Sequence, residues 1–149
     1  MSTNQPISVI GLNGSPNRAG NTATLMQWVL EGCIEAGAEV TWMHVVDYDV
    51  RYCRGCFTCL RTGACPIQDE FADLLAMLQA ADGIVAGSPV YEGYVTAQLK
   101  TLLDRITLLH LYTNRFDAQH TVGVATSGVA PTRGVAKELA TFFGHRVGM

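Results

Sequence analysis

The sequence predicts an α/β fold in which a doubly wound parallel sheet lies between two layers of helices. Three observations carry this prediction. Short apolar runs alternate with longer amphipathic stretches, the apolar runs have no polar face, and 149 residues suffice for one domain around a hydrophobic core. A strand buried on both faces has no polar side to alternate, and such strands belong to parallel sheets covered by helices on both faces.

The first βαβ unit is expected within residues 7–46. Residues 7–12 form a short apolar run that ends in a glycine-containing turn, which predicts a strand. Residues 22–36 carry apolar side chains at helical spacing, and Gly37 follows where a helix commonly ends in a left-handed residue. Residues 39–46 are rich in β-branched and aromatic side chains and predict the second strand.

The periodicity disappears over residues 47–68, where four of the five cysteines lie within thirteen residues. A stretch of this length without regular structure is typical of a functional loop. Residues 69–81 then predict a helix, and the apolar residues 83–88 predict the third strand.

The remaining elements repeat this alternation. A long amphipathic helix is expected at residues 95–112, an apolar strand at 121–126 and a last helix at 133–143. We therefore expect a single domain over residues 1–149 with a cysteine-rich insert at about 47–68. A fifth strand would begin at residues 148–149, so we expect either that this strand is missing or that a partner subunit covers the open sheet edge.

Composition excludes several classes of protein. Ten Lys and Arg against thirteen Asp and Glu leave a net charge of -3, so the basic surface that binds nucleic acid is lacking. No run of 18 apolar residues exists to cross a membrane. The polar first six residues do not resemble a signal peptide, so we expect a cytoplasmic protein whose cysteines serve a purpose other than disulfides.

In doubly wound sheets, ligands bind beyond the carboxyl ends of the strands. The loop after the first strand, residues 14–22, combines small residues with hydroxyl and amide side chains at a helix N-terminus, which favours a phosphate. It has neither a Walker lysine nor a G-x-G-x-x-G pattern, and no cysteine nucleophile, so a terminal monophosphate fits best. The alternative is an ordinary turn in which Asn21 or Thr22 caps the helix.

Two further loops lie at the same edge. In residues 87–94, Pro89 stiffens the turn, and Tyr91 and Tyr94 offer flat faces that can wall a planar heteroaromatic ring. An ordinary turn with surface tyrosines is the alternative. Residues 126–134 form a third, glycine-rich loop that is weak evidence by itself.

A monophosphate site beside an aromatic-walled slot describes flavin mononucleotide (FMN). The stretches GSPNRAGNT and GSPVYEGYVTAQLKTLLDR resemble the NADPH-dependent FMN reductases of the flavodoxin-like fold, and the resemblance covers nearly the whole chain. It implies FMN contacts at the phosphate from Ser15, Asn17, Asn21 and Thr22, and at the ring from Pro89, Val90, Tyr91, Glu92, Gly93, Ser127 and Gly128.

Cys53, Cys56, Cys59 and Cys65 form the pattern C-x2-C-x2-C-x5-C, followed by a proline. Three thiolates at this spacing converge closely and a fourth closes from the same loop, which suits a [4Fe-4S] cluster. Structural zinc, a redox-active dithiol and reduced thiols without a cofactor stay open as alternatives. The stretch CRGCFTCLRTGACPIQDE resembles the iron-sulfur flavoproteins, a branch of the same fold. The fifth cysteine, Cys33, is expected in the core.

These expectations describe an FMN-dependent oxidoreductase or electron-transfer protein, in which the flavin N5 carries the chemistry and no side chain acts as catalyst. NAD(P)H or a carrier such as ferredoxin would donate electrons, and oxygen or a quinone would accept them. The alternatives are a cluster-free NAD(P)H-dependent FMN or quinone reductase and a non-enzymatic, flavodoxin-like electron shuttle. The open sheet edge and the resemblance both favour a homodimer or homotetramer. Trp28 and Trp42 are expected to be packing residues.

Overall fold

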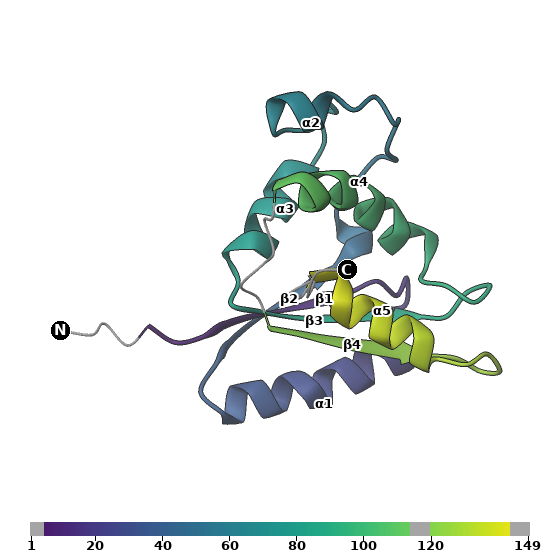
Figure 1. The fold of residues 1–149 in the computed structure, drawn as a ribbon. Coiled ribbons are helices and arrows are strands. Elements are labelled where there is room, and N and C mark those ends of the chain that lie inside the picture. The colour runs from purple at the N-terminus through teal and green to yellow at the C-terminus, as the bar shows by residue number, and fades with distance from the viewer. Residues whose placement is uncertain (1–4, 114–119, 144–149) are drawn as a thin grey trace.

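The computed structural model, which describes residues 5–113 and 120–143, contains a parallel sheet flanked by helices (Figure 1). The strands lie in the order β2-β1-β3-β4. Their bounds are β1 Ser8–Asn13, β2 Glu39–His44, β3 Gly83–Pro89 and β4 His120–Thr126. Because the chain runs outward from β1 in both directions, the sheet is doubly wound, and the predicted flavodoxin-like α/β class is confirmed.

Helices cover both faces of this sheet, as Figure 1 shows: α1 lies on one face, and α3, α4 and α5 lie on the other. These helices span α1 Asn21–Glu35, α3 Phe71–Ala80, α4 Ala97–Thr113 and α5 Arg133–Phe143. Within the described residues, no helix is both long and apolar enough to cross a membrane. The expected start of a fifth strand at residues 148–149 lies outside the described residues.

Two local predictions are wrong. Residues 45 and 46, expected to continue the second strand, instead belong to a short 3-10 helix, η1 (Val45–Asp47). The segment expected to lack regular structure contains the five-residue helix α2 (Thr58–Thr62). Both elements are single turns, and such short turns leave no periodic pattern in a sequence.

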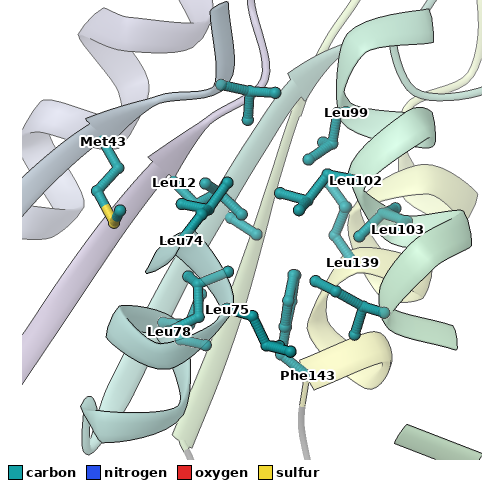
Figure 2. Packing of buried hydrophobic residues seen from close by; sticks show 14 of the residues in the cluster. Leu12, Met43, Leu74, Leu75, Leu78, Leu99, Leu102, Leu103, Leu139 and Phe143 are labelled. Atoms are coloured by element: carbon teal, nitrogen blue, oxygen red, sulfur yellow. The ribbon is translucent and has the colours of Figure 1, made fainter. Parts of the chain in front are cut away.

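The larger hydrophobic core lies between the sheet and the layer of α3, α4 and α5 (Figure 2). The side chains that meet there from β1 and the three helices are fully or almost fully buried, among them Leu12, Leu74, Leu78, Leu99, Leu102, Leu139 and Phe143. A smaller core under α1 joins Met26 and Leu30 to the sheet. Here a Cβ on Gly87 would lie 2.1 Å from the Met26 sulfur, so a larger residue at this position would push the Met26 side chain out of its place between α1 and β3.

The prediction that every strand is buried on both faces holds for β1 and β3 but is wrong for β2 and β4. The latter two lie at the ends of the strand order, where Trp42 and Val122 are 38% and 45% exposed. Trp42 stacks on His44, with 5.8 Å between ring centroids. Trp28 on α1 is 63% exposed, so its prediction as a packing residue is also wrong.

The end of α1 follows the sequence prediction. Gly37 adopts a φ of +91°, and its N–H donates to the Ile34 carbonyl at 2.9 Å. The next amide, of Ala38, donates to the Cys33 carbonyl at 3.0 Å. These two bonds form a Schellman motif, which satisfies carbonyl groups that the helix leaves unpaired and turns the chain into β2.

Candidate functional site

The three loops predicted to carry ligand contacts are hydrogen-bonded to one another at the carboxyl edge of the sheet. The Gly14 N–H donates to the Gly87 carbonyl at 2.7 Å, which joins the loop after β1 to the end of β3. The Val90 N–H donates to the Thr126 carbonyl at 2.8 Å. The hydroxyls of Thr22 and Thr126 lie 2.7 Å apart. The loops therefore form one connected surface.

Side chains of the loop after β1 hold its backbone in successive turns. Asn13 Oδ1 accepts from the Ser15 N–H at 2.9 Å, and Ser15 Oγ accepts from the Asn17 N–H at 3.1 Å. Asn17 Oδ1 in turn accepts from the Ala19 N–H at 3.1 Å. Each polar side chain bonds an amide two residues further on, a pattern that stabilises tight turns without a strand or helix.

The N-terminus of α1 is open to a ligand. Its N-cap is Gly20, no side chain caps it and no acidic residue lies in its first turn. The Thr24 N–H donates to the Gly20 carbonyl at 3.1 Å. The amides of residues 21–23 precede that bond and are the donors that a helix start leaves for other partners, with the dipole favouring an anion. The alternative in which Asn21 or Thr22 caps the helix is therefore wrong.

The four predicted phosphate ligands fall into two pairs. Ser15 is 4% exposed and Thr22 is 2% exposed, and both hydroxyls already take part in the loop's own hydrogen bonds. Asn17 and Asn21 are exposed, and the side-chain oxygen of Asn17 is the atom that bonds the Ala19 amide. The first pair shapes the loop and the second pair offers donors.

The loop after β3 folds back on itself. Tyr91 and Tyr94 exchange backbone hydrogen bonds of 2.9 and 3.0 Å, and Glu92 and Gly93 both have positive φ, 49° and 79°. Positive φ at both central residues is the geometry of a type I′ turn. Of the other predicted ring contacts, Pro89 is half-buried at the end of β3, and Val90 packs in the core.

The two tyrosines of this turn have different surroundings. Tyr91 is 54% exposed. Tyr94 is half-buried, and its hydroxyl donates to Glu138 Oε1 at 2.5 Å. Burial, together with the Glu138 carboxylate, raises the pKa of Tyr94 to about 12. Tyr91 is therefore the tyrosine with a free ring face.

The loop after β4 opens beside α1. Ser127 Oγ accepts from the amides of Ala130 at 2.8 Å and Val129 at 3.2 Å, and a Cβ on Gly128 would meet no atom within 4 Å. A groove runs from this loop to the start of α1. Its lining consists of Asn21, Thr24, Leu25, Trp28, Ala125, Thr126, Ser127 and Thr132.

Sequence reasoning missed two residues that support the loop after β1. Asn13 is fully buried, and its Nδ2 lies 3.1 Å from His44 Nδ1. Burial and the nearby Arg18 charge lower the pKa of His44. The register pairs these residues at the carboxyl ends of β1 and β2. Asn13, the polar residue directly after the first apolar run, was a signal that could have pointed to the first of them, whereas His44 lies inside the stretch predicted as the second strand.

An ion pair connects this loop to the cysteine-bearing segment. Arg18 binds Asp47 in η1, and its Nη1 donates to Asp47 Oδ2 at 2.8 Å. Both side chains are exposed, so the pair contributes little to stability. Its geometric effect is to hold the beginning of the segment beside the loop after β1.

The four clustered cysteines differ in burial. Cys59, on α2, is buried in the larger core, Cys53 and Cys65 are half-buried, and Cys56 is exposed. Left-handed residues frame α2, with Phe57 at a φ of 56° before it and Gly63 at 73° after it. Figure 1 shows α2 beyond α4 as seen from the sheet, and the two helices are in contact.

The thiols influence one another without forming a complete metal site. Burial raises the pKa of Cys59, and negative charge on Cys65, Cys53 and Cys56 raises it further. Cys56 has a lowered pKa because the amide and hydroxyl of Thr58 bond its sulfur. Among the described residues, no three Cys, His, Asp or Glu side chains form a group that could hold a metal ion. Thiolates are the ligands that soft metals prefer. In this structure, however, the four thiols are not gathered around one point.

Known proteins similar to this chain carry flavin-related names. An iron-sulfur flavoprotein of Methanocaldococcus jannaschii is 39% identical over 128 residues, which cover 86% of this chain and 65% of the relative. An iron-sulfur flavoprotein of Archaeoglobus fulgidus is 35% identical over 123 residues, covering 83% of this chain and 60% of the relative. The chain thus spans about three fifths of the length of these relatives.

A solved structure agrees with the fold. RosB with a bound riboflavin-5'-phosphate derivative superposes with a TM-score of 0.72 at 17% identity, covering 93% of this chain and 60% of that one. The sequence profile described as NADPH-dependent FMN reductase matches residues 7–149. With the doubly wound sheet and its three connected loops, this match shows that the chain belongs to the NADPH-dependent FMN reductase family.

Proposed function

We propose that this chain binds FMN and serves as an FMN-dependent oxidoreductase, with a [4Fe-4S] cluster on its cysteine segment. The observation that carries the proposal is the connected surface of three loops beside an uncapped helix N-terminus. Such an arrangement at the carboxyl edge of a doubly wound sheet provides both an anion site and a slot for a flat ring.

The phosphate would bind at the start of α1. The amides of residues 21–23 are the donors that a helix start leaves for other partners, and the exposed side chains of Asn17 and Asn21 add donors. Ser15 and Thr22 would support this site from below through their buried hydroxyls. No lysine is present in the loop, which agrees with a monophosphate rather than a di- or triphosphate.

The ring would bind between the loops after β3 and β4. The type I′ turn presents the backbone of residues 89–93, Tyr91 offers an exposed ring face, and the open space at Gly128 leaves room on the other side. When bound, FMN would exchange electrons with its partners singly or as a hydride. The residues of the chain then have the task of orienting the ring and limiting water around it.

The cluster proposal rests on the donor set. Cys53, Cys56, Cys59 and Cys65 supply four thiolates from one segment, and the two relatives named above bear iron-sulfur names. Binding would require the segment to close further. Ferredoxin or NAD(P)H would donate electrons, and oxygen or a quinone would accept them. The protein would assemble as a homodimer or homotetramer.

A cluster-free NAD(P)H-dependent FMN or quinone reductase is the second candidate. It is favoured by the open spacing of the four thiols, with Cys56 exposed. Iron and sulfide analysis after anaerobic purification distinguishes the candidates. If the chain carries a cluster, Cys56→Ser abolishes iron binding and leaves FMN bound. Cys33→Ser on α1 is the matched control and should keep both iron and FMN. Wild-type protein that contains flavin but no iron supports the second candidate.

The phosphate site is tested by Asn17→Asp. Aspartate keeps the oxygen that accepts from the Ala19 amide but replaces the exposed amide nitrogen with a negative charge. We expect the Kd for FMN to rise about tenfold or more, because the carboxylate repels the phosphate, and the Kd for riboflavin to stay unchanged. Gln27→Glu, with the same charge change further along α1, is the control. Quenching of flavin fluorescence measures both Kd values, and equal weakening for FMN and riboflavin contradicts the proposal.

Oxidation of NADH and NADPH by the flavin-loaded protein separates an enzyme from an electron shuttle. Steady turnover with oxygen or a quinone as acceptor is the expected result. A flavodoxin-like shuttle would accept electrons only through an added reductase, and absence of turnover with both nucleotides would contradict the enzymatic assignment.

A further inference from the structure

A buried ion pair lies at the base of the cysteine segment. Arg105 on α4 and Asp69, just before α3, have side chains 1% and 0% exposed, and Arg105 Nη1 bonds Asp69 Oδ2. The guanidinium also lies 4.0 Å from the ring centroid of Phe71. Neither charged residue belongs to the flavin site or to the thiols, so their function is not explained by the preceding proposal.

The pair joins both ends of the segment. Asp69 Oδ2 accepts from the Arg51 N–H at 2.8 Å, and Arg105 Nη1 donates to the Arg51 carbonyl at 3.2 Å. Next to it, Asp49 N–H donates to Glu70 Oε2 at 2.5 Å, and Glu70 N–H donates to the Asp49 carbonyl at 3.1 Å. Residues 49–51 are thereby tied to residues 69–70, and the chain between them carries all four clustered cysteines.

The bonding of Arg105 is incomplete. Its Nε and Nη2 are buried and have no hydrogen-bond partner among the described residues. A buried ion pair with unsatisfied donors is a poor source of stability, since apolar side chains of similar volume would cost less to bury. The pair therefore needs another explanation, and its position suggests one. Arg105 lies on α4, the helix that contacts the cysteine-bearing α2.

We propose that Arg105 is a positioning residue for the cysteine segment, which it holds through Asp69 and the Arg51 carbonyl so that the four thiols can converge on one metal centre. Its two spare N–H donors would bond the segment when it closes around a metal. The inference rests on the proposed function, because it assumes that the thiols bind metal. It goes beyond that function because it assigns the closure of the cysteine segment to the Arg105–Asp69 pair, a clamp that lies outside the cysteine motif.

The test compares three variants under anaerobic conditions. Arg105→Met removes the clamp but leaves the Asp69 charge buried and unpaired. Arg105→Met combined with Asp69→Asn removes both charges, so stability should recover while the two bonds that Arg105 donates, to residue 69 and to the Arg51 carbonyl, remain broken. Lys100→Met breaks the exposed pair with Asp104 on the same helix and is the matched control.

Titration of apoprotein with Co²⁺ gives a readout that stability alone does not move, because sulfur-to-metal absorption reports how many thiolates bind. We expect wild type and Lys100→Met to show a four-thiolate spectrum. The double variant should bind Co²⁺ about 10- to 100-fold more weakly, a typical effect of losing groups that orient ligands, and with a lower absorption per metal. Its FMN affinity and its melting temperature should match those of wild type.

The outcomes separate the two proposals. A double variant that regains stability together with the wild-type Co²⁺ spectrum and affinity overturns the positioning role, while the metal site itself stands. Wild-type protein that binds no Co²⁺ and takes up no iron and sulfide overturns the cluster proposal instead. Arg105→Met alone should lose both stability and metal affinity, and unchanged metal affinity in this variant also contradicts the clamp.

Discussion

At the scale of single residues, the orientation of one buried amide links two strands to the loop after β1. Asn13 Oδ1 accepts from the Ser15 amide, so its Nδ2 faces His44 Nδ1 as a donor. His44 Nδ1 must then be an acceptor, which requires a neutral ring with its proton on Nε2. Burial and the Arg18 charge keep the pKa of His44 below its usual value of 6.5, in agreement with this state.

This arrangement predicts that FMN binding weakens in mild acid. The lowered pKa means that the folded protein favours the neutral ring. The stability that the neutral ring contributes is therefore complete above pH 6.5, the usual pKa of histidine. It is lost as the pH falls through the lower pKa that His44 has in the folded protein. A protonated ring would direct N–H at the Asn13 amide nitrogen and disturb the bond to Ser15. We expect a higher Kd for FMN at pH 5 than at pH 7.5, measured by fluorescence quenching.

The control for this prediction is His44→Phe. It should lose the pH dependence that belongs to the ring, and it should be about 1–3 kcal/mol less stable because the buried Asn13 amide loses its partner. Riboflavin, measured in parallel, removes the titration of the FMN phosphate itself from the comparison. An unchanged pH profile in His44→Phe would show that the ring is not responsible.

Sequence reasoning at this scale succeeded where a residue's role follows from its neighbours along the chain. Gly37 ends α1 as predicted, because a Schellman motif is local. Asn13 and Trp28 were missed or misjudged because their surroundings depend on distant segments. Asn13 acquires its role from β2, and Trp28 is exposed because its side of α1 faces away from the smaller core.

At the scale of elements, the packing of α5 on β4 depends on one glycine. A Cβ at Gly123 would lie 1.9 Å from the Ala136 carbonyl oxygen and 2.9 Å from the Ala140 backbone nitrogen. These are backbone atoms of α5, so a rotamer change cannot relieve the clash and the helix must move outward. The helix would then lose part of its contact with the sheet through Val135 and Leu139.

We therefore expect Gly123→Ala to destabilise the fold by about 3 kcal/mol or more, at the upper end of what overpacking costs. The midpoint of urea unfolding, followed by circular dichroism, measures the effect. Gly128→Ala is the matched control, because a Cβ there meets nothing within 4 Å. Equal stability of the two variants would mean that α5 is not held as closely as the structure indicates.

Predictability at this scale follows the length and periodicity of each element. Within the described residues, the four longer helices and the four strands were located to within two residues at each end, because apolar spacing over many residues is distinctive. The helix α2 was not located, since five residues contain little more than one turn. The exposure of β2 and β4 also lay beyond sequence reasoning, because it depends on which strands occupy the edges.

At the scale of the whole molecule, two cores share the central strands. Ile10 and Leu12 of β1 enter the larger core, whereas Val9, which precedes them, enters the smaller one, and β3 divides in the same way. The convergence of the three loops followed from the carboxyl-end rule for such sheets. The position of the cysteine segment over α4 could not be predicted from the sequence, because Arg105 and Asp69 are separated by 36 residues and no periodic pattern connects them.

The shared strands predict that the flavin loops and the cysteine segment unfold together. Leu102 on α4 is fully buried in the larger core and belongs to neither site. We expect Leu102→Ala to cost about 2–5 kcal/mol, through lost burial and the cavity that remains. Met77→Ala, at a position 39% exposed on α3, should change stability by about 0.5 kcal/mol or less.

Two probes follow this unfolding in urea: release of bound FMN reports the carboxyl edge, and reaction of the buried Cys59 thiol reports α2. Because β1 and β3 form part of both cores, loss of the larger core should expose the smaller one and remove the support of every loop. Leu102→Ala should therefore shift both transitions equally and keep them coincident. The opposite outcome is that the Cys59 thiol reacts at a lower urea concentration than the one at which FMN is released. This would show that the cysteine segment opens independently and is held only by the Arg105–Asp69 clamp to α4.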